Sequence, residues 1–325
     1  MLTPPPRRSR AALKRMKSQD SVRTVIIALV ANVVIAIAKL ISGLMSGSVA
    51  LIAEAAHSFA DSSNEVLLGI SLRRAMKPPD DRHPLGHGRE RFLWAFMAAI
   101  ASFLIGGCFS IAIAIRELAR DGGTKRTLVA WIVLGIAFLA DGFSWLQSVK
   151  QARDEAEERG RSVSDHLLRS SDPIVRAIVV EDSAALIGLV IAAIGLLVSQ
   201  TTHSGRPDAI ASLLIGILMA VTAFGLARPL ADFLVGRSLP RPYLDKIRDV
   251  IQRDGAVEEI ISLQAVYTGP EEVIVAAKVR PKSELSGDEL AKAMDDLDAA
   301  LRRESQFVAD VYIDVTQHHT EPAPT

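Results

Sequence analysis

The sequence SVALIAEAAHSFADSSNE, residues 48–65, decides the fold, because it sets ionisable side chains at helical spacing inside an otherwise apolar stretch of membrane length. These side chains follow one another by three, four and four residues, so on a helix they share one face. They are Glu54, His57, Asp61 and Glu65. Each such group near a bilayer centre costs on the order of 2.5 to 3.5 kcal/mol, so this face should meet protein, water or an ion. We interpret it as a candidate metal site within a membrane; the alternative is a polar stripe that only joins helices, a role that Ser, Thr or Asn would fill at lower cost.

The composition agrees with a membrane protein that also has a soluble part. Hydrophobic residues make up 49% of the chain and charged residues 23%, and the charges are segregated along it. Lys plus Arg and Asp plus Glu balance at 37 each, so the net charge indicates no acidic partner, and we expect no nucleic acid. The single Cys108 excludes a disulfide within one chain and argues against a Cys-based zinc site. We expect Cys108 to be buried as a small apolar side chain.

Six apolar stretches are long enough to cross a membrane, since about 20 helical residues span a roughly 30 Å hydrocarbon core. They lie near residues 25–45, 49–70, 92–115, 128–149, 174–199 and 209–230. The second is too polar to be recognised from hydropathy, but without it the basic loops would not fall on one side of the membrane. The sequence therefore predicts a six-transmembrane-helix bundle. The count of six rests partly on the need for an even number of spans, which keeps the basic loops on one side of the membrane.

Basic residues indicate on which side of the membrane the ends of these stretches lie. The most basic segments are the start of the chain, the loop after the second stretch and the loop after the fourth, with Arg7, Arg8, Arg10, Lys14, Arg15 and Lys17; Arg73, Arg74, Lys77, Arg82, Arg89 and Arg91; and Lys150, Arg153, Arg159 and Arg161. The positive-inside rule then predicts cytoplasmic N- and C-termini. The contrast is weakened by Arg116, Arg120, Lys125 and Arg126. We expect no cleavable signal peptide before the first stretch, and the simple layout suggests a bacterial inner membrane.

Beyond residue 236 the pattern changes to that of a small soluble domain. Residues 243–253 and 287–303 have helical periodicity, whereas 258–266, 272–279 and 309–315 have the pattern of strands. The order α-β-β-α-β predicts an α+β layer of helices on one sheet. About 80 residues is marginal for a self-sufficient core, so we expect a homodimer. The predicted organisation is a basic segment 1–20, a six-helix membrane domain 21–236, a cytoplasmic α+β dimerisation domain 237–318 and a disordered tail 319–325.

Together these features resemble the cation diffusion facilitators, a family of divalent metal/proton antiporters. The resemblance rests on six spans with cytoplasmic termini, the run from Ser48 to Asp61, the loop DDRHPLGHGRE at residues 80–90 and the α-β-β-α-β tail, and it covers the chain from about residue 18 to residue 315. It implies divalent cation efflux by metal/proton antiport, with zinc favoured over manganese, iron or cobalt, and a metallochaperone-like C-terminal domain. The metal is then the transported substrate, and no cofactor is implied.

Two residues of the second span are the first candidate ligands. His57 and Asp61 are one turn apart, so the imidazole and the carboxylate can converge on one cation at about 2.0 to 2.2 Å, the distances typical of zinc. The resemblance implies that the fifth span supplies the other two ligands, a His and an Asp four residues apart. Asp182 matches that aspartate, but Ile178 stands where the histidine is expected and cannot bind metal. The fourth position would then be filled by Glu181, by the second oxygen of Asp182, by water or by another span.

Several other polar residues of the predicted spans have open roles. Glu181 and the aspartate after it point about 100° apart on a helix, so Glu181 is either a ligand of a distorted site or the ion-pair partner of a cation such as Lys39. Asp141 in the fourth span is either a waypoint for protons or metal, or a hydrogen-bond partner of a neighbouring helix. Asn64 and Glu65 lie toward the cytoplasmic side and could line the path to the site. Oxygen in place of a nitrogen ligand moves the preference toward harder ions such as Mn²⁺ or Fe²⁺.

The loop after the second span holds a second constellation, in which a carboxylate and two imidazoles are spaced by three and four residues. It consists of Asp80, His83 and His87. In related transporters the matching residues form a peripheral metal site at the cytoplasmic mouth. The alternative is a solvated loop in which Pro84 and Gly86 set a turn.

The remaining sequence narrows the class of protein. The C-terminal domain has no His and no Cys between residues 237 and 317, which argues against a two-metal cluster there, and His318 and His319 are interpreted as tail residues. We expect no enzyme, because the chain has no His-Glu-x-x-His pair and no nucleophile beside a base. An ion channel would need a continuous polar pore. A membrane metal-sensing or scaffolding protein that binds but does not transport metal stays open as the alternative, because Ile178 removes one ligand.

Overall fold

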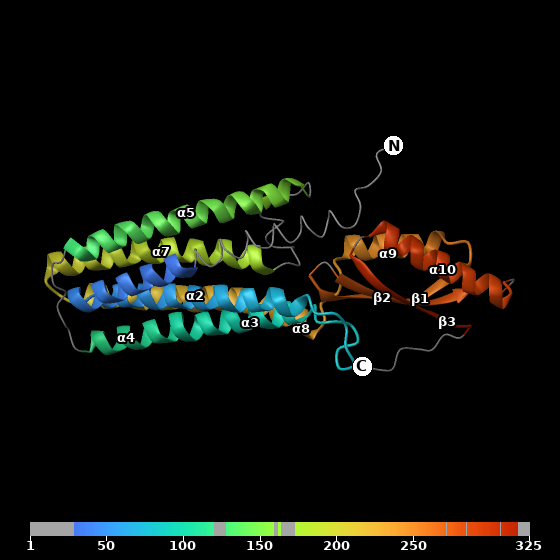
Figure 1. Ribbon diagram of the computed structural model, residues 1–325, viewed down its shortest axis with the longest axis horizontal. Helices are drawn as coiled ribbons and strands as arrows, with labels where there is room; N and C mark the ends of the chain where they lie inside the picture. The colour runs from blue at the N-terminus through green and yellow to red at the C-terminus, as the bar shows by residue number, and fades with distance from the viewer. Residues whose placement is uncertain are drawn as a thin grey trace. The chain divides into compact units, whose positions relative to one another are not determined.

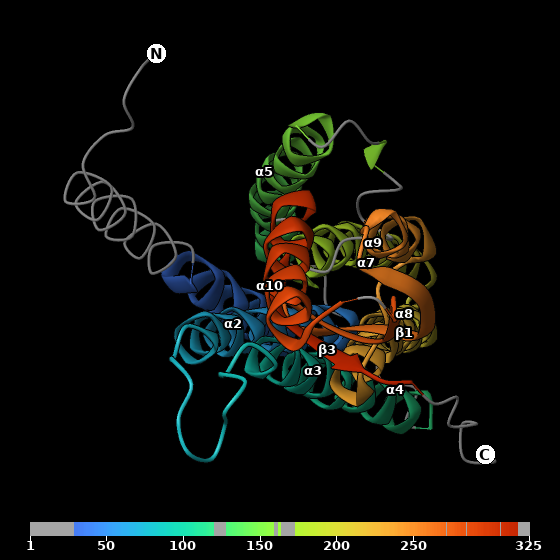
Figure 2. The same ribbon diagram turned by 90° about the vertical axis from the view of Figure 1, so that its right-hand side faces the viewer.

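The computed structural model describes residues 29–119, 128–158, 162–163, 173–270, 272–283, 285–305 and 307–317. The predicted basic segment 1–20 and tail 319–325, with His318, His319, Arg120, Lys125, Arg126, Arg159 and Arg161, lie outside these residues. The chain divides into two compact units, which are drawn in Figures 1 and 2. One unit comprises Met1–Ile70 and Trp94–Arg228, and the other comprises Ser71–Leu93 and Pro229–Thr325.

Five described helices are long and apolar enough to cross a membrane. They are Leu29–Ser46; the continuous Glu90–Leu118, formed by α3 (Glu90–Ser102), the π-helical η1 (Phe103–Cys108) and α4 (Phe109–Leu118); α5 (Leu128–Glu158); α7 (Pro173–Thr202); and α8 (Arg206–Val235). The helix α2 (Val49–Ala75) is not among them, although its 27 residues would extend about 40 Å. Its ionisable stripe lowers its hydropathy, which is why apolarity alone does not identify the predicted second span.

The first unit packs around small side chains. Its buried cluster joins the first half of α2 to α5, α7 and α8 and consists of Ala50, Leu51, Ala53, Ala130, Leu134, Ala137, Leu189, Ala192, Leu196, Ala211 and Ile215. Alanine lets helix backbones approach closely, which favours helix association where lipid is as apolar as the side chains. At Gly216 the backbone of α8 also closely approaches a neighbouring helix, since a Cβ there would lie 2.7 Å from Cγ1 of Ile111 on α4. Cys108 instead lies on the outer surface and is exposed, so the expectation that it is buried is wrong.

The N-terminus of α2 is fixed by a carboxylate from α8. Asp208 accepts a hydrogen bond from Ser48 Oγ at 2.6 Å and another from the backbone N–H of Ala50 at 3.2 Å. A carboxylate at this end satisfies free N–H groups and meets the positive end of the helix dipole. Asp208 is fully buried, so the contact sets the start of α2 beside the start of α8.

The C-terminal part forms a three-stranded mixed sheet packed against two helices (Figure 1). The elements follow the order α9 (Arg241–Arg253), β1 (Val257–Gly269), β2 (Glu272–Pro281), α10 (Gly287–Glu304) and β3 (Val308–Val315). The middle strand β2 is antiparallel to β1 and parallel to β3. α9 packs on β1, and α10 packs on α9 and β3. The core contains alternate residues of β2 together with apolar residues of both helices, among them Val273, Val275, Val279, Ile247, Ile251, Leu297 and Leu301.

The loop between α2 and α3 belongs to the same compact unit as this sheet. Phe92, near the start of α3, is fully buried and stacks on Phe233 near the end of α8, with ring centroids 4.6 Å apart. Phe233 meets the edge of Tyr267 on β1 at 5.4 Å. The backbones come closest at Gly88, where a Cβ would lie 2.6 Å from the carbonyl oxygen of Thr268. The loop is therefore held against the turn between β1 and β2.

The segment that leads from α8 to α9 is also paired with the sheet. The backbone N–H of Tyr267 donates to the carbonyl of Arg237 at 3.1 Å, and the N–H of Leu239 donates to the carbonyl of Ala265 at 3.0 Å. The guanidinium of Arg237 lies 4.9 Å from the ring centroid of Phe233. The connection at the predicted boundary of 237 is therefore an ordered, strand-paired segment.

Candidate metal sites

The first candidate ligands lie on α2, whose helical spacing sets His57 one turn before Asp61. The imidazole Nε2 lies 3.1 Å from Asp61 Oδ2. Two ligands that bind one ion at about 2.0 to 2.2 Å are separated by roughly this distance. His57 is 2% exposed, and Asp61 Oδ1 has no hydrogen-bond partner among the described residues. Because a buried oxygen is costly unless something satisfies it, this pair fits a cation.

Asp182 on α7 does not lie close enough to His57 and Asp61 to share an ion with both of them. Its Oδ2 accepts a hydrogen bond from Ser144 Oγ of α5 at 3.2 Å. Within the described residues, the ligand atoms of His57, Asp61 and Asp182 do not all lie within 4.8 Å of one another. Ile178, one turn before Asp182, offers no ligand atom. Three ligands around one ion therefore require Asp182 to leave Ser144 or α7 to approach α2.

Two carboxylates of the same unit are held by amide groups rather than by cations. Asn64 Nδ2 donates to Glu181 Oε1 at 2.6 Å, and Asn32 Nδ2 donates to Glu65 Oε1 at 2.6 Å. The alternative in which Glu181 pairs with Lys39 is wrong, since Lys39 pairs elsewhere. Asn64 Oδ1 and Glu65 Oε2 have no hydrogen-bond partner in the described part of the chain, so these oxygens stay open to a proton donor or a cation.

His57 has a second neighbour that no sequence pattern indicates. Its Nδ1 contacts the thioether sulfur of Met219 on α8, 162 residues later in the chain. Met219 is 2% exposed and also packs on η1, where a Cβ at Gly106 would lie 2.5 Å from its Cε. A thioether accepts hydrogen bonds only weakly, so Nε2 is the nitrogen with a strong polar neighbour, Asp61. The π-helical η1 thus contacts Met219, which in turn contacts the imidazole of His57. π-Helical segments occur frequently at functional sites.

A buried lysine forms another polar centre of the first unit. Lys39 Nζ lies 3.2 Å from Glu54 Oε2 and 3.5 Å from Asp141 Oδ2, and both Lys39 and Glu54 are completely buried. Asp141 therefore binds a neighbouring helix, one of the two roles considered for it. A lysine in the middle of an apolar stretch needs such partners, and this was the sequence signal that could have located the cluster.

The loop between α2 and α3 brings the other three predicted ligands together. His83 Nδ1 lies 3.1 Å from Asp80 Oδ1, and His87 Nε2 lies 3.1 Å from Asp80 Oδ2. One ligand atom from each lies within 4.8 Å of the others, which holds for no other group of three or more such residues in the described chain. Backbone N–H groups of Arg82 and His83 donate to Asp80 Oδ1 at 3.0 and 2.7 Å. Gly86 has a φ of 77°, which glycine adopts without strain. The turn and the candidate metal site are therefore compatible.

Hydrogen bonds within the loop shift the pKa values of Asp80 and His87. The hydrogen bond from His87, with the backbone N–H of His83, lowers the pKa of Asp80. The contact with Asp80, and then that with Glu90, raises the pKa of His87. Glu90, which sequence reasoning missed, lies 2.7 Å from His87 Nδ1 with its Oε1. It orients the imidazole as outer carboxylates orient metal-binding histidines.

We expect metal binding by the loop to weaken as the pH falls, because protons compete with metal for His87, whose pKa is raised. Glu90→Gln removes one carboxylate that favours the protonated imidazole, so the pH of half-maximal Zn²⁺ binding should move downward. Calorimetric titrations of the full chain with Asp61→Ala, which removes the pair on α2, measure this midpoint at several pH values. Asp81→Asn, in the same exposed loop, is the control and should leave the midpoint in place; an unchanged midpoint in Glu90→Gln would contradict the assignment.

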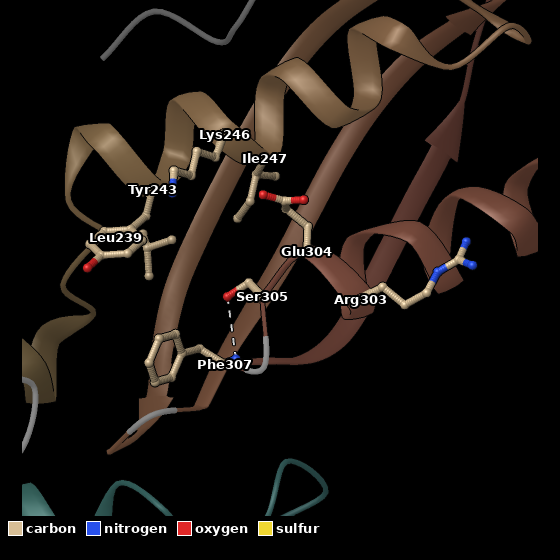
Figure 3. Close-up of a pocket in the computed structure, with 8 residues that line it drawn as sticks. All are labelled: Leu239, Tyr243, Lys246, Ile247, Arg303, Glu304, Ser305 and Phe307. Atoms are coloured by element: carbon tan, nitrogen blue, oxygen red, sulfur yellow. Dashed lines mark hydrogen bonds between the residues drawn. The ribbon is translucent and has the colours of Figure 1, made fainter. Parts of the chain in front are cut away.

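The C-terminal domain has a cavity of about 340 Å³, and its lining residues are drawn in Figure 3. Its lining residues are Leu239, Tyr243, Lys246, Ile247, Arg303, Glu304, Ser305 and Phe307. Ser305 Oγ accepts a hydrogen bond from the backbone N–H of Phe307 at 3.4 Å, the dashed line in Figure 3. Glu304 is the one carboxylate of this lining, and no imidazole or thiol accompanies it, so these residues do not make the cavity a candidate metal site.

Comparison with known proteins gives a family match and several distant relatives. A family model described as the cation efflux transmembrane domain matches residues 25–235. Metal tolerance protein C4 of Arabidopsis thaliana is 29% identical over 78% of this chain and 56% of its own length. The mitochondrial proton-coupled zinc antiporter SLC30A9 of Mus musculus is 26% identical over 86% of this chain and 48% of its own length. The manganese efflux system protein MneP of Bacillus subtilis is 25% identical over 77% and 80%. This chain thus spans about half the length of the first two relatives.

Proposed function

Since this chain belongs to the cation diffusion facilitator family, whose cation efflux transmembrane domain covers residues 25–235, we propose that it exports divalent metal cations in exchange for protons. The observation that carries the proposal is the buried pair of His57 and Asp61, with 3.1 Å between Nε2 and Oδ2 and one carboxylate oxygen unpartnered among the described residues. Ionisable groups inside a membrane protein mark ion pathways. The metal is the substrate, and the function needs no cofactor and no enzymatic step.

In this proposal α2, the second span in chain order, joins the five apolar helices and brings the number of spans of a multi-pass membrane protein to six. Its first half is buried against α5, α7 and α8, and Glu54 and His57 of its polar stripe are buried as well, so this part of the stripe faces protein and not lipid. Six spans put both termini on one side, which the basic loops assign to the cytoplasm. We further propose a bacterial inner membrane and a homodimer that forms through the α-β-β-α-β domain.

Zinc is the proposed substrate, ahead of manganese, iron and cobalt. The ligands would be His57 Nε2 and carboxylate oxygens of Asp61 and Asp182, with Glu181 in the position left open by Ile178. An imidazole with carboxylates suits zinc, whereas an oxygen-rich set moves toward Mn²⁺. The names of the relatives support both metals, since one is a zinc antiporter and another a manganese efflux protein. The loop residues Asp80, His83 and His87 would form a second, peripheral metal site.

Exchange with protons follows from the chemistry of these side chains. Metal binding needs a neutral imidazole and ionised carboxylates, so metal that enters from the cytoplasm displaces protons. When the site opens to the other side, protons displace the metal. The change between the two states would bring Asp182 away from Ser144 and toward the pair on α2, while small residues such as Gly216 allow the helices to slide.

Transport by the purified full-length chain in proteoliposomes tests this function. We expect uptake of Zn²⁺, and weaker uptake of Mn²⁺, Fe²⁺ or Co²⁺, that depends on an imposed pH gradient. Asp182→Asn removes the negative charge but keeps the shape, so uptake should fall to the level of empty liposomes. Thr201→Ala, also on α7, is the control: Thr201 Oγ1 donates to the carbonyls of Leu197 and Val198 within the same helix, and the variant should transport normally. Tight metal binding without uptake of any ion would favour the alternative of a metal-sensing or scaffolding protein.

A further inference from the structure

The ammonium group of Lys39 is enclosed by oxygens from two other helices. Lys39, on the helix Leu29–Ser46, is completely buried. Its Nζ lies 2.9 Å from Ser58 Oγ, 3.2 Å from Glu54 Oε2 and 3.5 Å from Asp141 Oδ2. An ammonium has three N–H donors, so each of them has an oxygen acceptor. Two carboxylates and a hydroxyl from α2 and α5 therefore surround one positive charge.

These oxygens are also the ligands that hard divalent cations prefer. When both are ionised, the two carboxylates Glu54 and Asp141 carry one negative charge more than the ammonium, whereas a divalent cation would balance both. Ser58 is adjacent to His57 on α2, and Glu54 precedes His57 by three residues. The cluster thus borders the proposed transport site.

The carboxylate of Glu54 is held in one orientation by α7. A Cβ at Gly188 would lie 2.3 Å from Glu54 Oε1, so this oxygen rests against the bare backbone of the glycine. Glu54 is completely buried, and Oε1 has no hydrogen-bond partner among the residues described. A cation in place of the ammonium could use this second oxygen, which Lys39 does not.

We propose that Lys39 is a tethered cation that fills a second cation site formed by Glu54, Ser58 and Asp141. The proposal rests on the proposed transport function and refines it: Lys39 limits the membrane unit to one divalent ion per chain, at His57 and Asp61. Without the ammonium, the three oxygen ligands bind a divalent cation of their own. Lys39 is then a residue that determines stoichiometry, not only an ion pair that joins helices.

Counting bound ions tests this proposal. The full chain with His83→Ala and His87→Ala, which removes the loop site, is equilibrated with Mn²⁺ in detergent, desalted and analysed by mass spectrometry of the metal. We expect about one Mn²⁺ per chain with Lys39 present and a doubling to about two in Lys39→Met, since oxygen ligands suit this ion. Lys39→Arg, which keeps the charge, and Lys39→Met with Glu54→Gln, which removes a ligand, should both stay at about one.

The outcomes separate this proposal from the transport function. An unchanged count in a folded Lys39→Met protein would overturn the tethered cation while the transport site stands. If the parent protein bound neither Mn²⁺ nor, in a parallel count, Zn²⁺, the transport site would be overturned, but a gain of one Mn²⁺ in Lys39→Met would still support the second site. If Lys39→Met unfolds, Mn²⁺ should restore its folding by taking the place of the ammonium; failure to fold at any Mn²⁺ concentration assigns Lys39 a structural role and contradicts the proposal.

Discussion

Replacement of His57 by alanine is expected to reduce Zn²⁺ transport to the background of empty liposomes, with the protein still folded. The imidazole is the one nitrogen ligand proposed in the membrane unit, and its Nε2 lies 3.1 Å from Asp61 Oδ2. Asp61→Ala should have the same effect, because it removes the carboxylate that shares the ion. Loss of a ligand leaves the site with too few groups to replace the hydration shell of the cation.

The controls for this prediction lie on the same helix. Ser63 Oγ donates to the carbonyl of Phe59 within α2 at 2.9 Å, so Ser63→Ala removes a hydrogen bond within the helix and no proposed ligand, and should transport normally. Size-exclusion chromatography and thermal unfolding in detergent would verify that all variants fold. Normal transport by His57→Ala or Asp61→Ala would show that the proposed site is wrong.

The second large effect is expected at Gly188, where alanine should lower the stability of the membrane unit by about 1 to 3 kcal/mol, the usual cost of overpacking. The added methyl group would lie 2.3 Å from Glu54 Oε1. Glu54 cannot turn away freely, since its other oxygen lies 3.2 Å from the buried ammonium of Lys39. Either α7 moves away from α2 or this ion pair lengthens, and both weaken the packing.

Gly135 on α5 is the matched control for this substitution. Among the described residues, no atom outside its own stretch of helix lies within 4 Å of a Cβ built there. Gly135→Ala should therefore leave the melting temperature unchanged or raise it slightly, as alanine favours a helix. Thermal unfolding of both variants in the same detergent gives the comparison. Equal melting temperatures would mean that Glu54 reorients at little cost and that Gly188 imposes no constraint.

The secondary structure of the C-terminal domain could be predicted because each element carries its own periodic signal. The predicted strand at 272–279 lies within β2 and the predicted helix at 287–303 lies within α10. α2 shows where this approach fails in the membrane unit. Its stripe of ionisable residues predicts a polar face, but hydropathy cannot tell a buried polar span from a surface helix, because the neighbours that cover it come from distant parts of the chain.

The candidate sites likewise include residues that local spacing brings together and residues that only helix packing brings together. Asp80, His83 and His87 lie within eight residues, so their spacing alone brings them together, and His57 with Asp61 is fixed by one helical turn. The contacts of Met219 and Asn64 join separate helices and leave no local pattern, and Lys39 is marked by its place in an apolar stretch although its partners are not. The position of Asp182 against Ser144 likewise depends on how α5 and α7 pack, which no spacing within one helix encodes.

The close approach at Gly88 has a consequence for protein engineering. The loop that carries Asp80, His83 and His87 and the C-terminal sheet form one structural module, because Ser71–Leu93 and Pro229–Thr325 pack as a single unit. A chimera that received only the loop of a relative would set foreign side chains against the turn at Thr268, where even a methyl group at position 88 does not fit. Both segments should therefore be transplanted together.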